Sequence, residues 1–138
     1  MEFTEIGLGD LPMLEDFLSR LSIGKQSFRY FDKRPLSIIE QHVSTLLLME
    51  DDRAIAYGHL DQENDTVWLG IAVADDERGK GYGKWMMQAL LQKARELEIS
   101  AITLTVDQEN VIAQRLYERM GFEEVGQAAH YRKYQLIL

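Results

Sequence analysis

The segment Thr66–Val73 constrains the fold of this 138-residue chain more than any other. Its eight residues, TVWLGIAV, form a nearly unbroken apolar run, whereas a strand with one solvent-facing side alternates polar and apolar residues. The run therefore predicts a central β-strand that is covered on both faces. A sheet covered in this way needs helices on each side, which indicates an α/β fold.

Two helices are expected after this strand. Apolar residues recur with helical spacing between Gly83 and Leu97, so that one face of a helix packs on the sheet. This stripe comprises Trp85, Met86, Ala89, Leu90, Ala94 and Leu97. A β-branched strand from Ala101 to Val106 leads to a second stripe, which ends at the helix terminator Gly121. The second stripe comprises Ile112, Ala113, Leu116, Tyr117 and Met120, and two more strands are expected after it.

The first elements of the chain are a strand and a helix. The strand is expected near Phe3 to Ile6. Asp10 is a candidate helix cap, and Pro12 suits the first turn of a helix that runs to about Leu21.

A short second helix and a run of strands follow. The segment Ser37–Glu40 has the spacing of a capping box, which predicts a helix start. Thr45–Met49 and Ala54–Leu60 form a predicted hairpin around Asp51-Asp52, and Asn64-Asp65 makes the turn into the central strand. The expected fold is therefore one α/β domain over all 138 residues, with a mixed sheet of about seven strands flanked by about four helices.

The composition limits the partners. Fifteen basic and twenty-three acidic side chains give a net charge of -8, which opposes general attraction to nucleic acid or anionic lipid. Without cysteine, a disulfide, a thiolate metal site and a cysteine nucleophile are excluded. The N-terminus has no signal-peptide pattern, and no apolar run approaches the roughly 20 residues of a membrane span. A cytoplasmic protein without membrane partners is expected.

A glycine-rich loop follows the central strand. The loop comprises Arg78, Gly79, Lys80, Gly81, Tyr82 and Gly83 and leads into a predicted helix. The first amides of a helix lack internal partners and lie at the positive end of its dipole, so the loop suits a pyrophosphate. A simple turn between strand and helix is the alternative. The loop lacks the Gly-Lys-Ser/Thr of a Walker motif and the context of a Rossmann fingerprint.

Two motifs resemble those of the GNAT superfamily of acetyl-CoA-dependent N-acetyltransferases. The pattern Arg78-x-x-Gly81-x-Gly83 is similar to the family's cofactor motif, (Q/R)xxGx(G/A). The segment Asn110–Phe122, NVIAQRLYERMGF, is similar to its second block, NxxAxxLYexxGF. The resemblance covers about Val67 to Phe122.

The resemblance implies acetyl-CoA as the acyl donor and direct acetyl transfer to an amine, without a metal. Tyr117 matches the family's general acid, which protonates the departing thiolate. An amide near Val73 would stabilise the oxyanion. The implied cofactor-binding residues are Ile71, Ala72, Val73, Arg78, Gly79, Lys80, Gly81, Tyr82, Gly83, Lys84 and Asn110.

The general base is less clear from the sequence. Some relatives in the family place a glutamate where this chain has Thr105, and others place one near Gly70, but neither carboxylate is present. His59 is the catalytic candidate because an imidazole titrates near pH 6.5. Asp107 and a water relay are alternatives, and a purely structural role for His59 also remains open.

The resemblance implies an acceptor site between the first two helices, where relatives commonly build it. The segment Ser27–Arg34 mixes aromatic and basic side chains, and Phe28, Arg29 and Tyr30 are the candidate acceptor-binding residues. The expected acceptor is a small-molecule primary amine, such as an amino sugar, amino acid or polyamine. Protein N-terminal acetylation and a non-catalytic acyl-CoA sensor are the alternatives. An ordinary amphipathic connection would explain the segment equally well.

The C-terminal segment Tyr131–Leu138 alternates apolar residues in a way that suits an edge strand. Pairing of two such strands across a homodimer is a hypothesis from this pattern.

Overall fold

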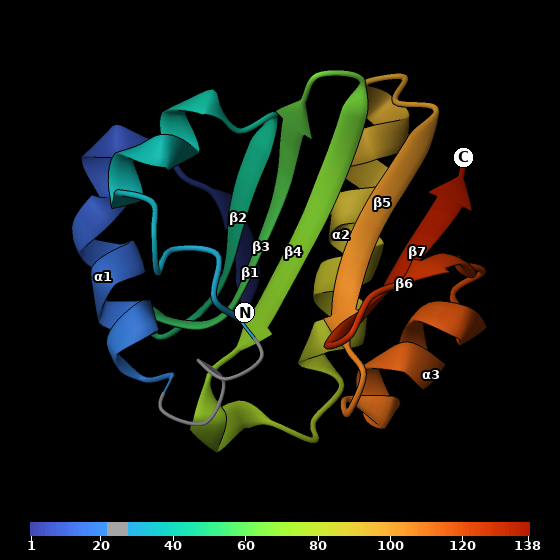
Figure 1. Ribbon diagram of the computed structural model, residues 1–138. Helices are drawn as coiled ribbons and strands as arrows, with labels where there is room; N and C mark the ends of the chain where they lie inside the picture. Colours follow the sequence, from blue (N-terminus) through green and yellow to red (C-terminus); the bar gives the residue numbers. More distant parts are fainter. Residues whose placement is uncertain (22–27) are drawn as a thin grey trace.

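The computed structural model describes residues 1–21 and 28–138. Its strands form one seven-stranded mixed sheet in the order β1-β2-β3-β4-β5-β7-β6 (Figure 1), which confirms the predicted fold class. The strands are β1 (Glu2–Glu5), β2 (Ser44–Glu50), β3 (Arg53–Glu63), β4 (Thr66–Val73), β5 (Ala101–Asp107), β6 (Glu123–Gln127) and β7 (Tyr131–Ile137). The helices are α1 (Leu11–Ser19), α2 (Tyr82–Glu96) and α3 (Val111–Arg119), with shorter 3-10 helices η1 (Leu8–Asp10), η3 (Leu36–Gln41) and η4 (Asp75–Glu77).

The centre of the sheet contains its one parallel pair. Strands β4 and β5 pair in parallel at Trp68 and Thr103, whereas the other neighbouring strands are antiparallel. Beyond this point the two strands diverge toward their C-terminal ends (Figure 1). The divergence leaves facing backbone edges at the middle of the sheet, where the cofactor motif begins.

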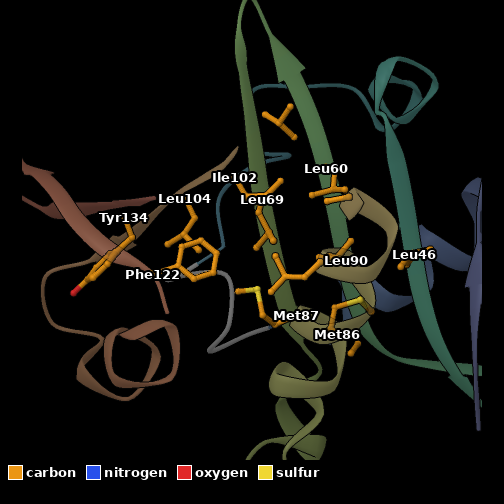
Figure 2. Packing of buried hydrophobic residues seen from close by; sticks show 14 of the residues in the cluster. Leu46, Leu60, Leu69, Met86, Met87, Leu90, Ile102, Leu104, Phe122 and Tyr134 are labelled. Atoms are coloured by element: carbon orange, nitrogen blue, oxygen red, sulfur yellow. The ribbon is translucent and has the colours of Figure 1, made fainter. Parts of the chain in front are cut away.

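One face of the sheet is covered by α2 and α3. The buried face of α2 comprises Met86, Met87, Leu90, Leu91 and Ala94. These side chains pack against Leu60 and Leu69, which face each other across β3 and β4 (Figure 2). On the opposite face α1 and η3 pack with Leu14, Phe17 and Ile39, and this cluster reaches β4 only at Ala72. The predicted cover of β4 on both faces is therefore only partial, because the other β4 residues on this face are half-buried. No described helix is long and apolar enough to cross a bilayer.

The helical stripes differ from prediction in detail. Trp85 and Leu97 are about half exposed, and Ile112 is 84% exposed, so none of the three is core. The buried face of α2 instead includes Met87 and Leu91, because the helix presents the positions next to the predicted ones to the sheet. The apolar pattern therefore predicted the helix correctly, but the observed buried face is turned about the helix axis relative to the predicted one.

Two predicted caps are wrong. Asp10 precedes α1, but its Oδ2 accepts a hydrogen bond from the Gly7 amide at 3.0 Å, so η1 uses this carboxylate. The capping box at Ser37 and Glu40 does not form either. The 3-10 helix η3 already begins at Leu36, directly after Pro35, with no side-chain cap. Pro35 fixes the chain direction there, which places Ser37 inside the first turn.

The C-terminal edge-strand prediction is also wrong. Strand β7 lies inside the sheet, between β5 and β6, and pairs on both sides. Its alternating apolar pattern reflects burial of Tyr134 in the core rather than a free edge. The edge strands are β1 and β6, so β7 offers no backbone for pairing across a dimer.

Candidate active site

A cavity of about 470 Å³ lies where β4 and β5 diverge. Because strand residues alternate between faces, Gly70 and Asp107 of its lining point toward the α1 face. Ile71 and Val106 point to the α2 face, where Asn110 and Tyr117 also line the cavity. The cavity therefore extends between the strands and joins the two faces of the sheet.

The glycine loop lies just past the end of β4. Gly79 and Gly81 have φ values of +78° and +86°, a region that favours glycine. Gly81 is the N-cap of α2, so the amides of residues 81–84 are the unpaired donors at the positive end of the helix. None of residues 78–84 lines the cavity. Of the predicted cofactor-binding residues, Ile71 and Asn110 do line it.

The cations of the loop are ion-paired within the preceding turn. Lys80 Nζ lies 2.9 Å from Glu77 Oε2, and Arg78 Nε lies 3.9 Å from Asp75 Oδ1. The Glu77 carboxylate raises the pKa of Lys80, which keeps that side chain cationic. Because both cations are ion-paired with carboxylates, the backbone amides are the main groups of the loop that can bind an anion.

Asn110 and Tyr117 line the cavity from the α2 face. The Asn110 Oδ1 accepts a hydrogen bond from the Ala113 amide at 3.2 Å, which confirms its predicted role as a helix cap. Tyr117 packs against Phe122 and Tyr134, yet it also lines the cavity. Desolvation raises the pKa of Tyr117 to about 12. The phenol is therefore neutral near pH 7 and can donate a proton.

His59 is a buried residue on the α1 face of β3, only 2% exposed. It lies directly opposite Gly70 across β3 and β4, and its imidazole covers the space above this glycine. A Cβ at position 70 would lie 2.6 Å from His59 Cε1 and 2.7 Å from Nε2. The absence of a side chain at Gly70 therefore leaves the room that the imidazole occupies.

Tyr57 determines how His59 can act. Its Oη lies 2.7 Å from His59 Nδ1. Desolvation raises the pKa of Tyr57 well above its usual value and lowers the pKa of His59 well below its own, so the two groups are a phenol and a neutral imidazole. If Nδ1–H donates to Tyr57, Nε2 is a proton acceptor, but if Tyr57 donates, Nε2 carries the hydrogen.

A polar network fixes the segment 28–34 over this site. The Tyr30 hydroxyl donates to Asp61 Oδ2 at 2.8 Å and contacts His42 Nε2 at 2.7 Å. His42 Nδ1 in turn lies 2.8 Å from Thr45 Oγ1. Desolvation raises the pKa of Tyr30 above its usual range and lowers the pKa of His42. The network therefore consists of neutral rings around the Asp61 carboxylate.

All three predicted acceptor-binding residues, Phe28, Arg29 and Tyr30, line the cavity, together with His59 and Tyr117. Ser27 lies outside the described residues. Tyr57, His42 and Asp61 were not predicted as site residues from the sequence. The alternation of Tyr57, His59 and Asp61 along β3 was the available signal, because polar residues repeat at every second position of a strand.

Comparison with known proteins decides the family. The sequence model of the Acetyltransferase (GNAT) family matches residues 11–122. The chain belongs to the GNAT family of acetyltransferases. Enzymes of this family use acetyl-CoA. The two motifs at Arg78 and Asn110 lie within the matched residues.

Relatives in this GNAT family differ in the acceptor that their names give. The spermine/spermidine N(1)-acetyltransferase of Bacillus subtilis is 41% identical over 69 residues, which cover 49% of this chain and 45% of that protein. The L-methionine sulfoximine/L-methionine sulfone acetyltransferase of Pseudomonas paraeruginosa is 37% identical over 62 residues, or 45% and 36% of the two chains. The matched region thus spans less than half the length of either relative.

Solved GNAT structures match the fold over almost the whole chain. The GNAT domain of S. lividans PAT has a TM-score of 0.86 at 16% identity and covers 99% of this chain and 89% of that one. The PaiA N-acetyltransferase of Thermoplasma acidophilum, solved in complex with coenzyme A, has a TM-score of 0.82 at 14% identity, with 99% and 98% covered. At these identities the match shows the fold alone.

Proposed function

We propose that this chain transfers an acetyl group from acetyl-CoA to the primary amine of a small molecule, by direct attack in a ternary complex. The observation that carries the proposal is the cavity between β4 and β5. It brings Tyr117 and Asn110 on one face together with His59 and Tyr30 on the other. Two substrates can therefore meet inside the sheet from opposite faces.

The cofactor side supplies main-chain groups and one acid. Residues 71–73 offer the β4 edge that diverges from β5, and the amides of residues 81–84 suit the diphosphate. Bound acetyl-CoA supplies the thioester whose acetyl group is transferred. The amide near Val73 would stabilise the charge that develops on the carbonyl oxygen. The Tyr117 phenol would give its proton to the sulfur as the C–S bond breaks.

On the acceptor side, His59 is the proposed base. In the tautomer in which Nδ1–H donates to Tyr57, the Nε2 lone pair lies beside Gly70 and can take the proton that the amine loses as its C–N bond forms. Asp107 lines the same cavity, but its Oδ1 is 3.0 Å from Arg29 Nη2 in an ion pair. His59 is therefore the stronger candidate, and Asp107 remains the alternative.

A small acceptor fits the shape of this site better than a peptide. The segment 28–34 is fixed over β3 by the Tyr30 network, and Arg29 joins it to the end of β5. The Haemophilus ducreyi relative named [Ribosomal protein bS18]-alanine N-acetyltransferase, 34% identical over 55% of this chain and 53% of that protein, keeps a protein acceptor as the competing candidate. A peptide needs an open groove, whereas the bridged segment favours an enclosed pocket.

The test is release of free thiol from acetyl-CoA in the presence of amino acids, amino sugars, polyamines and N-terminal peptides. Mass spectrometry of the product would identify the acetylated atom. We expect thiol release that depends on a small amine. Release only with peptides would contradict the small-molecule acceptor, and cofactor binding without release from any amine would indicate a sensor domain.

A further inference from the structure

One ion pair connects the two walls of the acceptor side. Arg29 Nη2 lies 3.0 Å from Asp107 Oδ1, although the residues are 78 positions apart in the chain. Arg29 belongs to the segment 28–34, and Asp107 is the last residue of β5. Both line the cavity, and their side chains are 55% and 26% exposed. A ligand that enters from solvent therefore meets this pair.

The backbones that carry both charged side chains are held in place by neighbouring residues. Phe28 packs on the buried Tyr57 ring with centroids 5.3 Å apart, and Tyr30 is anchored to Asp61 and His42. The backbone of Arg29 is thus fixed on both sides. At the other partner, Gln114 Nε2 donates to the Asp107 carbonyl oxygen at 3.0 Å. Because both backbones are fixed, a ligand that binds here has only the two side chains left to order.

We propose that this pair recognises an acceptor that carries a carboxylate next to its amine, as an α-amino acid does. The inference rests on the proposed acetyl transfer and names the substrate class of the same site. The acceptor carboxylate would bind the Arg29 guanidinium, and the acceptor ammonium would bind Asp107. One internal ion pair is then replaced by two pairs with the zwitterion, whose total charge of zero matches that of the site.

The exchange is favourable for two reasons. An exposed ion pair contributes little to stability, so opening the Arg29–Asp107 contact costs little. A guanidinium binds a free carboxylate through two parallel hydrogen bonds, whereas the present contact joins one nitrogen to one oxygen. A polyamine would instead place a second positive charge near Arg29.

The second arginine of the segment has a supporting role. Arg34 Nη1 donates to the Tyr30 carbonyl oxygen at 2.9 Å, and the guanidinium lies 4.3 Å from the centroid of the Tyr30 ring. Its Nη2 is 3.8 Å from Glu63. Arg34 also lines the cavity, but these contacts hold its guanidinium against Tyr30 and Glu63 of β3. Arg29 is thus the guanidinium that faces β5 across the cavity.

The experiment compares acceptors that differ only in the carboxylate. L-phenylalanine is paired with phenethylamine and L-methionine with 3-(methylthio)propylamine, and the amino-acid amides are included because their amines are less basic than those of the decarboxylated compounds. We expect kcat/KM to be at least about 10-fold higher for the acids than for either analogue. In Arg29→Gln this ratio should fall to near one.

Arg53→Gln is the matched control, because Arg53 forms an exposed ion pair with Asp76 at 2.8 Å and does not line the cavity. It should keep the wild-type ratio. If Arg29→Gln does not fold, the inference is tested by the wild-type ratio of kcat/KM for the acids to kcat/KM for their analogues. Equal use of acids and decarboxylated amines, or a preference for spermidine, would overturn the inference while leaving the acetyl transfer intact.

A different failure separates the two proposals. If no amine releases thiol, the proposed function is contradicted instead. Titration calorimetry of L-methionine and 3-(methylthio)propylamine with the coenzyme A complex would then test recognition alone. Tighter binding of L-methionine would support the Arg29 site, and equal or weaker binding would overturn it.

Discussion

The most informative perturbation is a methyl group at Gly70, tested with and without the imidazole opposite it. In wild type the new Cβ would lie 2.6 Å from His59 Cε1, closer than real Cβ contacts. The ring cannot move freely, because Tyr57 holds Nδ1 at 2.7 Å and the Tyr30 ring centroid lies 4.3 Å from its own. Overpacking of this kind costs about 1–3 kcal/mol, so Gly70→Ala should lower the free energy of unfolding by that amount.

The effect of Gly70→Ala on the free energy of unfolding should change sign once the imidazole is removed. In His59→Ala no imidazole opposes the methyl group, and alanine is about 0.5–1 kcal/mol more favourable than glycine inside a strand. The coupling energy of the double-mutant cycle should therefore be about 1.5–4 kcal/mol. Urea unfolding at pH 8, where histidine is neutral in both states, measures all four variants. An equal cost of Gly70→Ala in both backgrounds would refute the packing of His59 over Gly70.

Three further predictions concern the cofactor side and pH. Tyr117→Phe should keep acetyl-CoA affinity but lower the single-turnover rate about 100-fold, because only the acidic hydroxyl is lost; an unchanged rate would remove the acid role. Gly81→Trp or Gly83→Trp should abolish acetyl-CoA binding in calorimetry, and a folded variant with normal affinity would contradict the diphosphate site. The pKa of His59 is lowered in the folded state. Below the unfolded pKa of about 6.5 the unfolded chain therefore binds a proton that the folded protein does not, and the free energy of unfolding falls as the pH is lowered. Urea unfolding from pH 8 to 5 should show a loss from His59 of up to about 1.4 kcal/mol per pH unit. His59→Leu should lack this loss and keep only the loss from His42, whose pKa is also lowered; equal slopes in the two proteins would contradict a buried neutral imidazole at position 59.

Periodicity and turn chemistry were sufficient to predict most of the fold. The unbroken run in β4 indicated cover on both faces, and Asp51, Asp52 and Asn64 adopt the positive φ values that tight turns need. The order of strands was not available from these patterns. β7 inserts between β5 and β6 through contacts distant in the sequence, and no local signal separates an inner antiparallel strand from an edge strand.

The site was predictable to different degrees on its two sides. The loop and Asn110 depend on local backbone geometry and spacing, which a sequence shows directly. The acceptor side depends on side chains that come together from distant segments, such as the Tyr30 contact with Asp61 across 31 positions. Phe28, Arg29 and Tyr30 were predicted from the aromatic and basic residues of their segment and from the place that the family resemblance gives the acceptor site, but their buried partners were not.

The pairing of His59 with Gly70 shows how this site can lack a carboxylate at both Gly70 and Thr105. A base on β4 or β5 must project from its own strand into the gap between them. Here β4 contributes only a hydrogen atom at position 70, and the ring reaches the same space from β3, one strand away. The imidazole then needs a partner to fix its tautomer, and Tyr57 lies two residues earlier on the same face of β3. Tyr57→Phe should therefore lower activity and flatten its pH profile while His59 stays in place, since the hydroxyl acts only through the ring.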